Sequence, residues 1–363
     1  MSTSFVSSSS PIDLSLYARN YEITAAEVDS ATKISSAEEE VDDNNMWDVT
    51  LREFKNLYCP FQWKINEHKD AAAQATDIWS KEYGFPPCAK NLPDLLMAGN
   101  HPDCPDEMLL AFICLGEWVF VYDDKVERKL CNDPEKLKEL NQKNSDVLRG
   151  KLNAMDGDDI LTKAMDNLRE KFEGISKPEW RARFIKDMED YFEANYWESA
   201  KTKEGRIPEM EEYLNMRLRT GAVYLMFALC ELAAGVEISD EVFNDRYVQA
   251  LRESCNKWIF LSNDIISYPK EAKGTGNNII HIFMAKEGCS LGEAIAKTRD
   301  LCNAEMGKIL DLIEKMPSSY TENEKKYFNE LVRWLISSKE WSERTPRYKK
   351  PIPKDLPMFN QKV

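Results

Sequence analysis

Apolar residues recur every three or four positions along most of the chain from residue 46 onward, and this is the spacing of one face of an α-helix. The segment that opens at Pro105 shows the pattern clearly, with Met108, Phe112 and Phe120 at helical intervals. Similar segments lie at about 133–149, 158–175, 178–203, 208–234, 240–271, 277–287, 290–314 and 321–340. The alternation typical of β-strands is nowhere sustained. The pattern therefore predicts an all-α fold in one domain that spans residues 46–358.

The first 45 residues break this pattern. Ser, Thr and acidic residues dominate them, and they end in the polar run Glu38–Asn45. Such a composition cannot bury enough apolar surface to fold. We therefore expect residues 1–45 to form a disordered, polar and acidic N-terminal tail.

The first helix after the tail that can be delimited in detail follows Asn66, a suitable N-cap residue. We expect it to end near Gly84, ahead of two prolines. Its apolar positions predict a buried face made of Ala71, Ala75, Ile78 and Trp79.

Composition limits the classes of partner. The 363 residues carry 48 Lys and Arg against 63 Asp and Glu, which gives a formal net charge of -15. No basic stripe offsets that field, so nucleic acid is not an expected partner. An anionic substrate would also be repelled, unless metal ions and a local cluster of cations reversed the sign of the field at its site.

Cysteine and histidine usage points to the redox environment. Nine cysteines are scattered without a Cys-x-x-Cys pair, and the chain has only three histidines. This argues against a zinc site and a disulfide framework. There is no signal-peptide pattern and no uninterrupted apolar run of about 18 residues. We expect a cytoplasmic protein without a membrane span.

The strongest chemical signal lies in the apolar run that starts at Trp258. Asn263, Ser267 and Glu271 are each four residues apart, so on a helix they share one face. An amide, a hydroxyl and a carboxylate together form a low-charge oxygen site that suits Mg²⁺, with positions left for water and phosphate oxygens. The alternative is a polar helix surface. Pro269 lies between two of the three ligands, and we expect the helix to kink or end there.

A second acidic group follows an apolar helix. Asp123 and Glu127 are four residues apart and can face one point, whereas Asp124 lies about 100° around the helix. Two carboxylates with this spacing can hold metal ions that bind a diphosphate. In a chain this acidic, a solvated helix face is the alternative interpretation.

Two cationic segments complete the candidate chemistry. Arg217 lies in an otherwise apolar helix, where a guanidinium usually binds an anion, and Gly221 can break that helix and expose a carbonyl. The alternative is an exposed Arg217 paired with Glu211 or Glu212. After the last helix, Arg347 and Tyr348 stand together as donors for a phosphate. A basic tail with Lys349, Lys350 and Lys354 is the alternative there.

Together these residues resemble the class I terpene synthases of the microbial type, single-domain α-helical cyclases that are also found in non-plant eukaryotes. The similarity covers residues 60–350. The motifs that carry it are Asn66-Glu-His68, Asp123-Asp124-x-x-Glu127, Trp180-x-x-Arg183, Tyr213-Leu-x-x-Arg217-x-x-Thr220-Gly221, Asn263-Asp-x-x-Ser267-x-x-Lys270-Glu271 and Arg347-Tyr348. Glu127 and Thr220 stand where the family more often has Asp. The resemblance implies a helical bundle around a central active-site cavity.

The resemblance also implies roles for these residues. Three Mg²⁺ ions would be held by the Asp123, Asp124 and Glu127 motif and by Asn263, Ser267 and Glu271. Arg217 would sense the diphosphate, Thr220 would be the linker, and Gly221 would supply a carbonyl. Lys270, Arg347 and Tyr348 would donate hydrogen bonds to the diphosphate.

Aromatic rings would form the wall of the pocket, because an allylic cation is stabilised by π faces. Phe120 and Trp341 resemble the wall positions of the family. Phe112, Tyr224 and Phe260 also have suitable spacing, but an aromatic residue at helical spacing is more often part of the core.

One further motif resembles a different chemistry. Asp156-Gly-Asp-Asp159 fits the D-x-D-D pattern of cyclases that protonate an alkene, but those enzymes have another, longer architecture. Here the motif precedes a predicted helix, where Asp serves as an N-cap. We expect a structural role.

The leading hypothesis is a Mg²⁺-dependent terpene cyclase that ionises farnesyl or geranylgeranyl diphosphate and closes the cation into a sesquiterpene or diterpene. A chain-elongating prenyl diphosphate synthase is the first alternative, although its second motif is normally rich in Asp. A non-catalytic helical interaction protein is the second alternative. Substrate length remains open between C15 and C20, and the family suggests a homodimer.

Overall fold

The computed structural model describes residues 41–42, 45–272 and 277–349, and these residues form helices without a β-strand between them. The predicted all-α fold is confirmed. The predicted tail, residues 1–45, lies almost entirely outside the described residues, as do Lys350 and Lys354. The five longest helices are α5 (Asp106–Lys125), α8 (Pro178–Glu204), α13 (Arg246–Glu271), α15 (Leu291–Glu314) and α16 (Glu322–Arg344).

Shorter helices connect and cover these five. They are α2 (Met46–Lys55), α3 (Lys69–Tyr83), α4 (Pro93–Asn100), α6 (Pro134–Leu148), α7 (Ile160–Ile175), α9 (Met210–Thr220), α10 (Val223–Phe227), α11 (Leu229–Ala234), α12 (Asp240–Phe243) and α14 (Ile279–Glu287). Two 3₁₀ turns, η2 (Cys88–Lys90) and η4 (Pro346–Tyr348), and a π-helical segment, η3 (Val126–Leu130), complete the fold.

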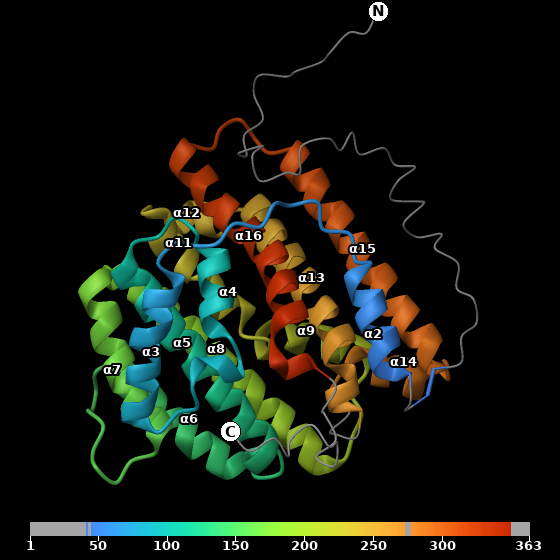
Figure 1. Ribbon diagram of the computed structural model, residues 1–363, viewed down its shortest axis with the longest axis horizontal. Helices are drawn as coiled ribbons and strands as arrows, with labels where there is room; N and C mark the ends of the chain where they lie inside the picture. The colour runs from blue at the N-terminus through green and yellow to red at the C-terminus, as the bar shows by residue number, and fades with distance from the viewer. Residues whose placement is uncertain (1–40, 43–44, 273–276, 350–363) are drawn as a thin grey trace, which may run out of the picture.

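The helices form a bundle in which α13 and α16 lie near the middle (Figure 1). α13 packs along α15, α16 and α2, while α5 packs against α3, α4 and α7. α8 links these two groups. It contacts α6, which packs on α7, and it contacts α9, which packs on α13. Figure 1 shows α3 and α7 on one side of the bundle and α14 and α15 on the other.

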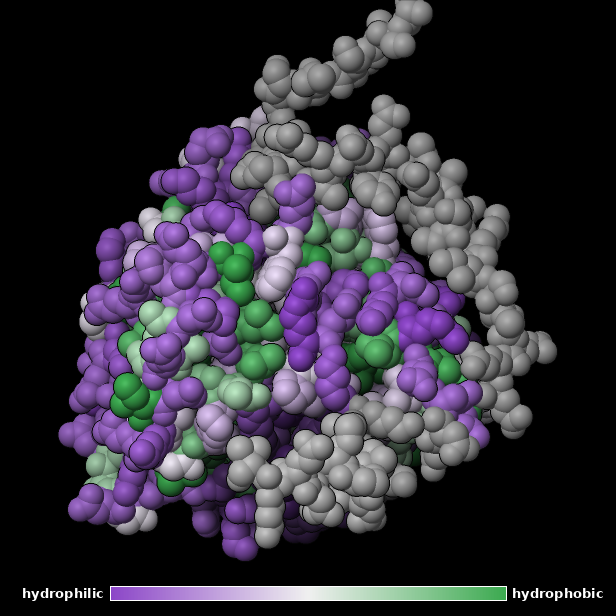
Figure 2. All heavy atoms as spheres, in the orientation of Figure 1, coloured by the Kyte–Doolittle hydropathy of each residue, from purple (hydrophilic) through white to green (hydrophobic). Residues whose placement is uncertain are grey.

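The outer surface agrees with the acidic composition. The face in Figure 2 is mostly hydrophilic, and apolar side chains reach it only in small separate groups. No helix among the described residues combines the length and the apolar character that a membrane crossing requires. All nine cysteines are free thiols.

Local sequence signals account for several helix ends. Ser290 and Glu293 form a reciprocal capping box at α15, and Thr321 and Glu324 form another at α16. Asp159 accepts a hydrogen bond from the backbone N–H of Leu161 at the start of α7. The structural role expected for the D-x-D-D segment is thereby confirmed.

The prediction for α3 was wrong in two details. The helix starts at Lys69, and Asn66 instead donates to the carbonyls of His101 and Cys104. The buried face is Ala72, Thr76 and Trp79, whereas Ile78 is 73% exposed. Tertiary packing against α5 therefore rotated the face by about one residue.

The segment 208–234 breaks at Gly221, as expected, and again at Ala228, so it forms three helices. The left-handed residue at the break is Ala222, with φ 58°, whereas Gly221 keeps a right-handed conformation with φ -74°. Gly221 instead leaves space for the Arg217 side chain. A Cβ there would lie 3.2 Å from a terminal nitrogen of Arg217, so any other residue would require the guanidinium to shift by a few tenths of an ångström.

Pro269 does not end α13. The helix continues through it to Glu271, so of the two expectations for the proline, a kink or an end, the end was wrong. Because the break comes two residues later, Asn263, Ser267 and Glu271 all remain on one continuous helix.

Candidate active site

A cavity of about 380 Å³ lies inside the bundle. Its charged end is lined by the last turns of α5 and α13 together with η3 and η4, and its apolar end by α4, α10 and α16. Most of the predicted site residues line it. These are Phe120, Asp123, Glu127, Arg217, Thr220, Gly221, Asn263, Lys270, Glu271, Trp341, Arg347 and Tyr348.

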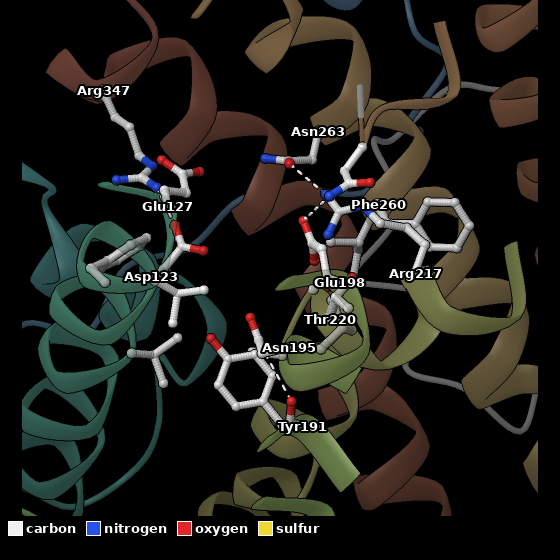
Figure 3. Close-up of a pocket in the computed structure, with 18 of the residues that line it drawn as sticks. Asp123, Glu127, Tyr191, Asn195, Glu198, Arg217, Thr220, Phe260, Asn263 and Arg347 are labelled. Carbon is white, nitrogen blue, oxygen red and sulfur yellow. Dashed lines mark hydrogen bonds and ion pairs between the residues drawn. The ribbon is translucent and has the colours of Figure 1, made fainter. Parts of the chain in front are cut away.

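Asp123 and Glu127 point into one side of the cavity (Figure 3). Glu127 belongs to the π-helical segment that follows α5, a type of helix irregularity that is frequent at functional sites. One carboxylate oxygen each from Asp123, Asp124 and Glu127 lies within 4.8 Å of the others, and the two residues that line the cavity, Asp123 and Glu127, fit a divalent cation.

Asp124 faces away from the cavity. Its two oxygens accept hydrogen bonds from Lys90 Nζ at 2.5 Å and from an Arg347 terminal nitrogen at 2.8 Å. Burial alone would raise the pKa of Asp124, but these two cations lower it to about 2. Asp124 therefore fastens the end of α5 to η2 and to the C-terminal turn.

Each acidic residue of the first motif already has a cationic neighbour. Arg347 pairs with Asp123, and Lys270 Nζ lies 2.9 Å from a Glu127 oxygen. Burial and the charge of Asp123 raise the pKa of Glu127. The Arg347 side chain is 8% exposed. The interpretation of this residue as part of a solvated basic tail was therefore wrong.

On the opposite side of the cavity, α13 supplies the second motif. Asn263 Oδ1 accepts from Arg217 at 2.9 Å, and Asn263 Nδ2 donates to the Tyr348 hydroxyl at 2.8 Å. Glu271 accepts from Asn278 Nδ2 at 3.0 Å. The Ser267 hydroxyl is buried and has no hydrogen-bond partner among the described residues. Ser267 does not line the cavity, unlike Asn263 and Glu271 on the same helix, but its hydroxyl is an oxygen donor of the kind that Mg²⁺ prefers.

Arg217 is held by the residue next to Asn263. Its Nε donates to Asp264 Oδ1 at 3.1 Å, and Asp264 also accepts from the Tyr213 hydroxyl and from the backbone N–H of Ile279. Burial would lower the pKa of Arg217, yet Asp264 and other nearby anions raise it. Arg217 is thus fixed inside the bundle, and its predicted alternative, an exposed pair with Glu211 or Glu212, was wrong.

Aromatic rings stand below the charged groups. Phe120 and Trp341 stack with ring centroids 5.3 Å apart, and Trp341 meets Tyr348 edge to face at 5.6 Å. Trp341 is oriented by a hydrogen bond from its indole nitrogen to the Asn91 carbonyl. Of the further aromatic candidates, Phe260 lines the cavity, whereas Phe112 and Tyr224 are not part of its lining.

Helix α8 contributes residues that the sequence analysis missed. Tyr191, Asn195, Glu198 and Thr202 follow at helical spacing along its cavity face, and the first three are labelled in Figure 3. Glu198 accepts from Asn277 Nδ2 at 3.0 Å. Burial raises the pKa of Glu198 to about 7, although Arg217 opposes the shift. The spacing of polar residues on one face of α8 is the signal that could have revealed them.

Comparisons with known proteins agree with this geometry. A family model described as "Terpene synthase family 2, C-terminal metal binding" matches residues 114–308, which is more than half of the chain. The (+)-T-muurolol synthase of Roseiflexus castenholzii, whose name specifies cyclisation of (2E,6E)-farnesyl diphosphate, is 29% identical over 80% of this chain and 93% of its own length. Sesquiterpene synthase 6 of Postia placenta is 28% identical over 80% and 88%.

Solved structures share the fold. The crystal structure of germacradien-4-ol synthase from Streptomyces citricolor matches with a TM-score of 0.71 at 23% identity, covering 80% of this chain and 98% of that one. A protein from ancestral sequence reconstruction, SVS_A2, matches with a TM-score of 0.71 at 22% identity over 82% and 95%.

Proposed function

Because the chain belongs to terpene synthase family 2, we propose that it is a Mg²⁺-dependent class I cyclase that ionises farnesyl diphosphate and closes the resulting cation into a sesquiterpene. The enzyme is a lyase, since the carbon–oxygen bond to the diphosphate breaks and the electron pair leaves with the diphosphate. Relatives named as farnesyl diphosphate cyclising enzymes support the C15 substrate over its C20 homologue.

One arrangement carries this proposal. Two sets of oxygen donors, one from α5 and η3 and the other from α13, stand on opposite sides of a single cavity (Figure 3). Arg217, Lys270 and Arg347 line the same cavity. A diphosphate placed between the two sets of donors would meet these cations, and the hydrocarbon chain would extend toward the aromatic rings.

Three Mg²⁺ ions are the expected cofactor. The groups that would hold them are Asp123 and Glu127 on one side, and Asn263, Ser267 and Glu271 on the other. When bound, the ions neutralise the charge that gathers on the departing diphosphate. Asp124 would act one step removed, because it orients the end of α5 through Lys90 and Arg347.

The cationic side chains would stabilise the transition state directly. As the carbon–oxygen bond lengthens, negative charge grows on the diphosphate, and donors already fixed in place bind it more strongly than they bind the intact ester. Arg217 is preorganised by Asp264 and Gly221, and Tyr348 is preorganised by Asn263. Without a ligand, Arg347 pairs with Asp123 and Lys270 pairs with Glu127. These two cations would therefore already lie beside the metal-binding carboxylates when the diphosphate binds.

The apolar end of the cavity would protect the carbocation. Phe120 and Trp341 offer ring faces without a lone pair, and cation–π attraction in a dry site reaches about 2 kcal/mol per ring. Their stacking and the Trp341 hydrogen bond fix the rings in place. A nucleophilic side chain is not needed for ionisation.

The test is an assay with purified protein, Mg²⁺ and the C10, C15 and C20 diphosphates offered separately. We expect inorganic diphosphate and a cyclic C15 product from farnesyl diphosphate, and no activity in the presence of excess chelator. Longer diphosphates formed only after addition of isopentenyl diphosphate would identify a chain-elongating synthase instead. Binding without turnover of any substrate would identify a non-catalytic protein.

A further inference from the structure

The apolar end of the cavity has a defined floor. The lining residues at this end include Gly116 on α5, Met97 on α4 and Trp334 on α16. Gly116 precedes Asp123 by seven residues, which places it about 10 Å below the first motif along the helix. The positions one and two turns earlier on α5, including Phe112, belong to the core and do not line the cavity.

The side chain of Met97 lies against Gly116, where the missing Cβ leaves a notch in the surface of α5. A Cβ added at Gly116 would lie 2.8 Å from the terminal methyl of Met97, so this methyl occupies the space that an alanine would fill. Met97 is 1% exposed and lines the cavity. The glycine therefore lets Met97 lie flat against α5, and the methionine closes the bottom of the cavity.

Helix α4 cannot retreat to relieve a clash. A Cβ at Gly99 would collide with the Ser337 hydroxyl of α16, which shows how closely the two helices approach. The same hydroxyl donates to the carbonyl of Leu96 at 3.1 Å. With α4 fixed on α16, a larger residue at position 116 would push the methyl of Met97 into the cavity.

The depth of the floor bears on substrate length. An isoprene unit contains four carbon–carbon bonds along the chain, each about 1.5 Å, so an extended unit advances by about 5 Å. A depth of about 10 Å accepts about two extended units. A C15 chain, with three units, must fold back on itself, which is the geometry that cyclisation requires, and a C20 chain, with four units, would have to fold back further in the same space.

We propose that Met97, lying in the notch that Gly116 leaves in α5, is the residue that restricts this enzyme to C15 diphosphates. This inference rests on the proposed function for the chemistry, but it concerns the floor alone. Removing the methionine opens the floor to longer chains, and filling the notch raises the floor.

The experiment compares four variants: Met97→Ala, Gly116→Ala, the double variant, and Met165→Ala. Met165 is fully buried in α7 and does not line the cavity, so it controls for general loosening of the core. Affinity is measured by calorimetry with Mg²⁺ and the unreactive thiolodiphosphate analogues of the C10, C15 and C20 substrates. The kcat/KM for each natural diphosphate is measured in parallel.

We expect Met97→Ala to raise the C20 to C15 ratio at least ~10-fold in both measurements, since one or two methylenes in a pocket change specificity by about this factor or more. Gly116→Ala should raise the C10 to C15 ratio. In the double variant the alanine at 116 meets no methyl, so its effect should largely disappear. Met165→Ala should leave both ratios within about twofold of wild type.

Ratios in Met97→Ala and Gly116→Ala that match those of Met165→Ala would overturn the inference. The three unreactive analogues report on the floor even without turnover. Thus altered affinity ratios with no turnover by the wild type would support the floor and refute the proposed cyclase, whereas turnover with unaltered ratios would do the reverse.

Discussion

Glu117 gives a stability prediction that can be worked out from its surroundings. This residue of α5 has no exposed surface, and neither carboxyl oxygen has a hydrogen-bond partner among the described residues. Burial raises its pKa to about 8, with Lys90 opposing the shift and Asp77 adding to it. The group is therefore a neutral acid in the folded protein at neutral pH.

The sign of the pH dependence follows from the two states. The unfolded chain releases the Glu117 proton near pH 4.5, whereas the folded protein keeps it until about pH 8. Between these values the unfolded chain gains stability from ionisation, so the free energy of unfolding falls by about 1.4 kcal/mol per pH unit from this group. Below pH 4.5 the stabilising contribution of Glu117 to the free energy of unfolding is fully present. By pH 8 roughly 4 kcal/mol of this contribution has been lost.

The substitution Glu117→Gln removes this titration and keeps the shape of the side chain. We expect its free energy of unfolding relative to wild type to rise by roughly 3 to 4 kcal/mol from pH 5 to pH 8. Urea unfolding followed by circular dichroism at pH 5, 6.5 and 8 measures this difference. A difference between variant and wild type that is the same at all three values would refute the reasoning.

Glu189 supplies the control. Hydrogen bonds from Arg149 and Ser145 lower its pKa, so both its folded and unfolded forms are ionised throughout pH 5–8. Glu189→Gln should be less stable than wild type by an amount that does not change over this range. A pH-dependent difference here would show that the effect is not specific to burial.

Three further predictions concern the site. Asn263→Ala removes a proposed Mg²⁺ ligand that is also the hydrogen-bond partner of Arg217 and Tyr348. It should reduce diphosphate release at least ~100-fold with little change in circular dichroism, and turnover by the variant at the wild-type rate would exclude the metal role. Phe120→Leu should lower kcat for farnesyl diphosphate by about 30-fold, from about 2 kcal/mol of cation–π attraction, whereas Phe120→Tyr keeps most of the activity; equal activity of the two would argue against a ring effect. Arg347→Met should weaken Mg²⁺-dependent binding of inorganic diphosphate by roughly tenfold or more, and Arg347→Lys should weaken it less; calorimetry distinguishes them.

Much of this fold follows from local signals in the sequence. Helical spacing of apolar residues predicted the long helices in order from α5 to α16, because each of them buries residues at helical intervals. Short-range spacing also grouped Asn263, Ser267 and Glu271 on one helix and Asp123 with Glu127 on another. These relations hold within a single helix, so they do not depend on how the helices pack.

The relations between helices were not predictable in this way. Asp264 and Lys90 received no role from the sequence, because their partners Arg217 and Asp124 lie on other elements. The cavity face of α8 was missed for the same reason. At α3, packing against α5 chose a face one residue from the expected one, and at the α9 break the left-handed residue was Ala222 where glycine had been expected to supply the flexibility.

The floor of the cavity shows a similar limit. Gly116 in the sequence is only a small residue at helical spacing, and its meaning depends on the methyl of Met97, which arrives from α4. A contact between two helices in the interior decides the depth of the cavity. Substrate length was therefore open between C15 and C20 in the sequence, and the proposal of a C15 substrate depends on this packing.

The most direct test of the central claim is the stoichiometry of the reaction with farnesyl diphosphate as the only organic substrate. We predict one inorganic diphosphate released per cyclic C15 molecule formed, only in the presence of Mg²⁺. Absence of diphosphate release, or release accompanied by a longer prenyl diphosphate in place of a cyclic product, would contradict the account.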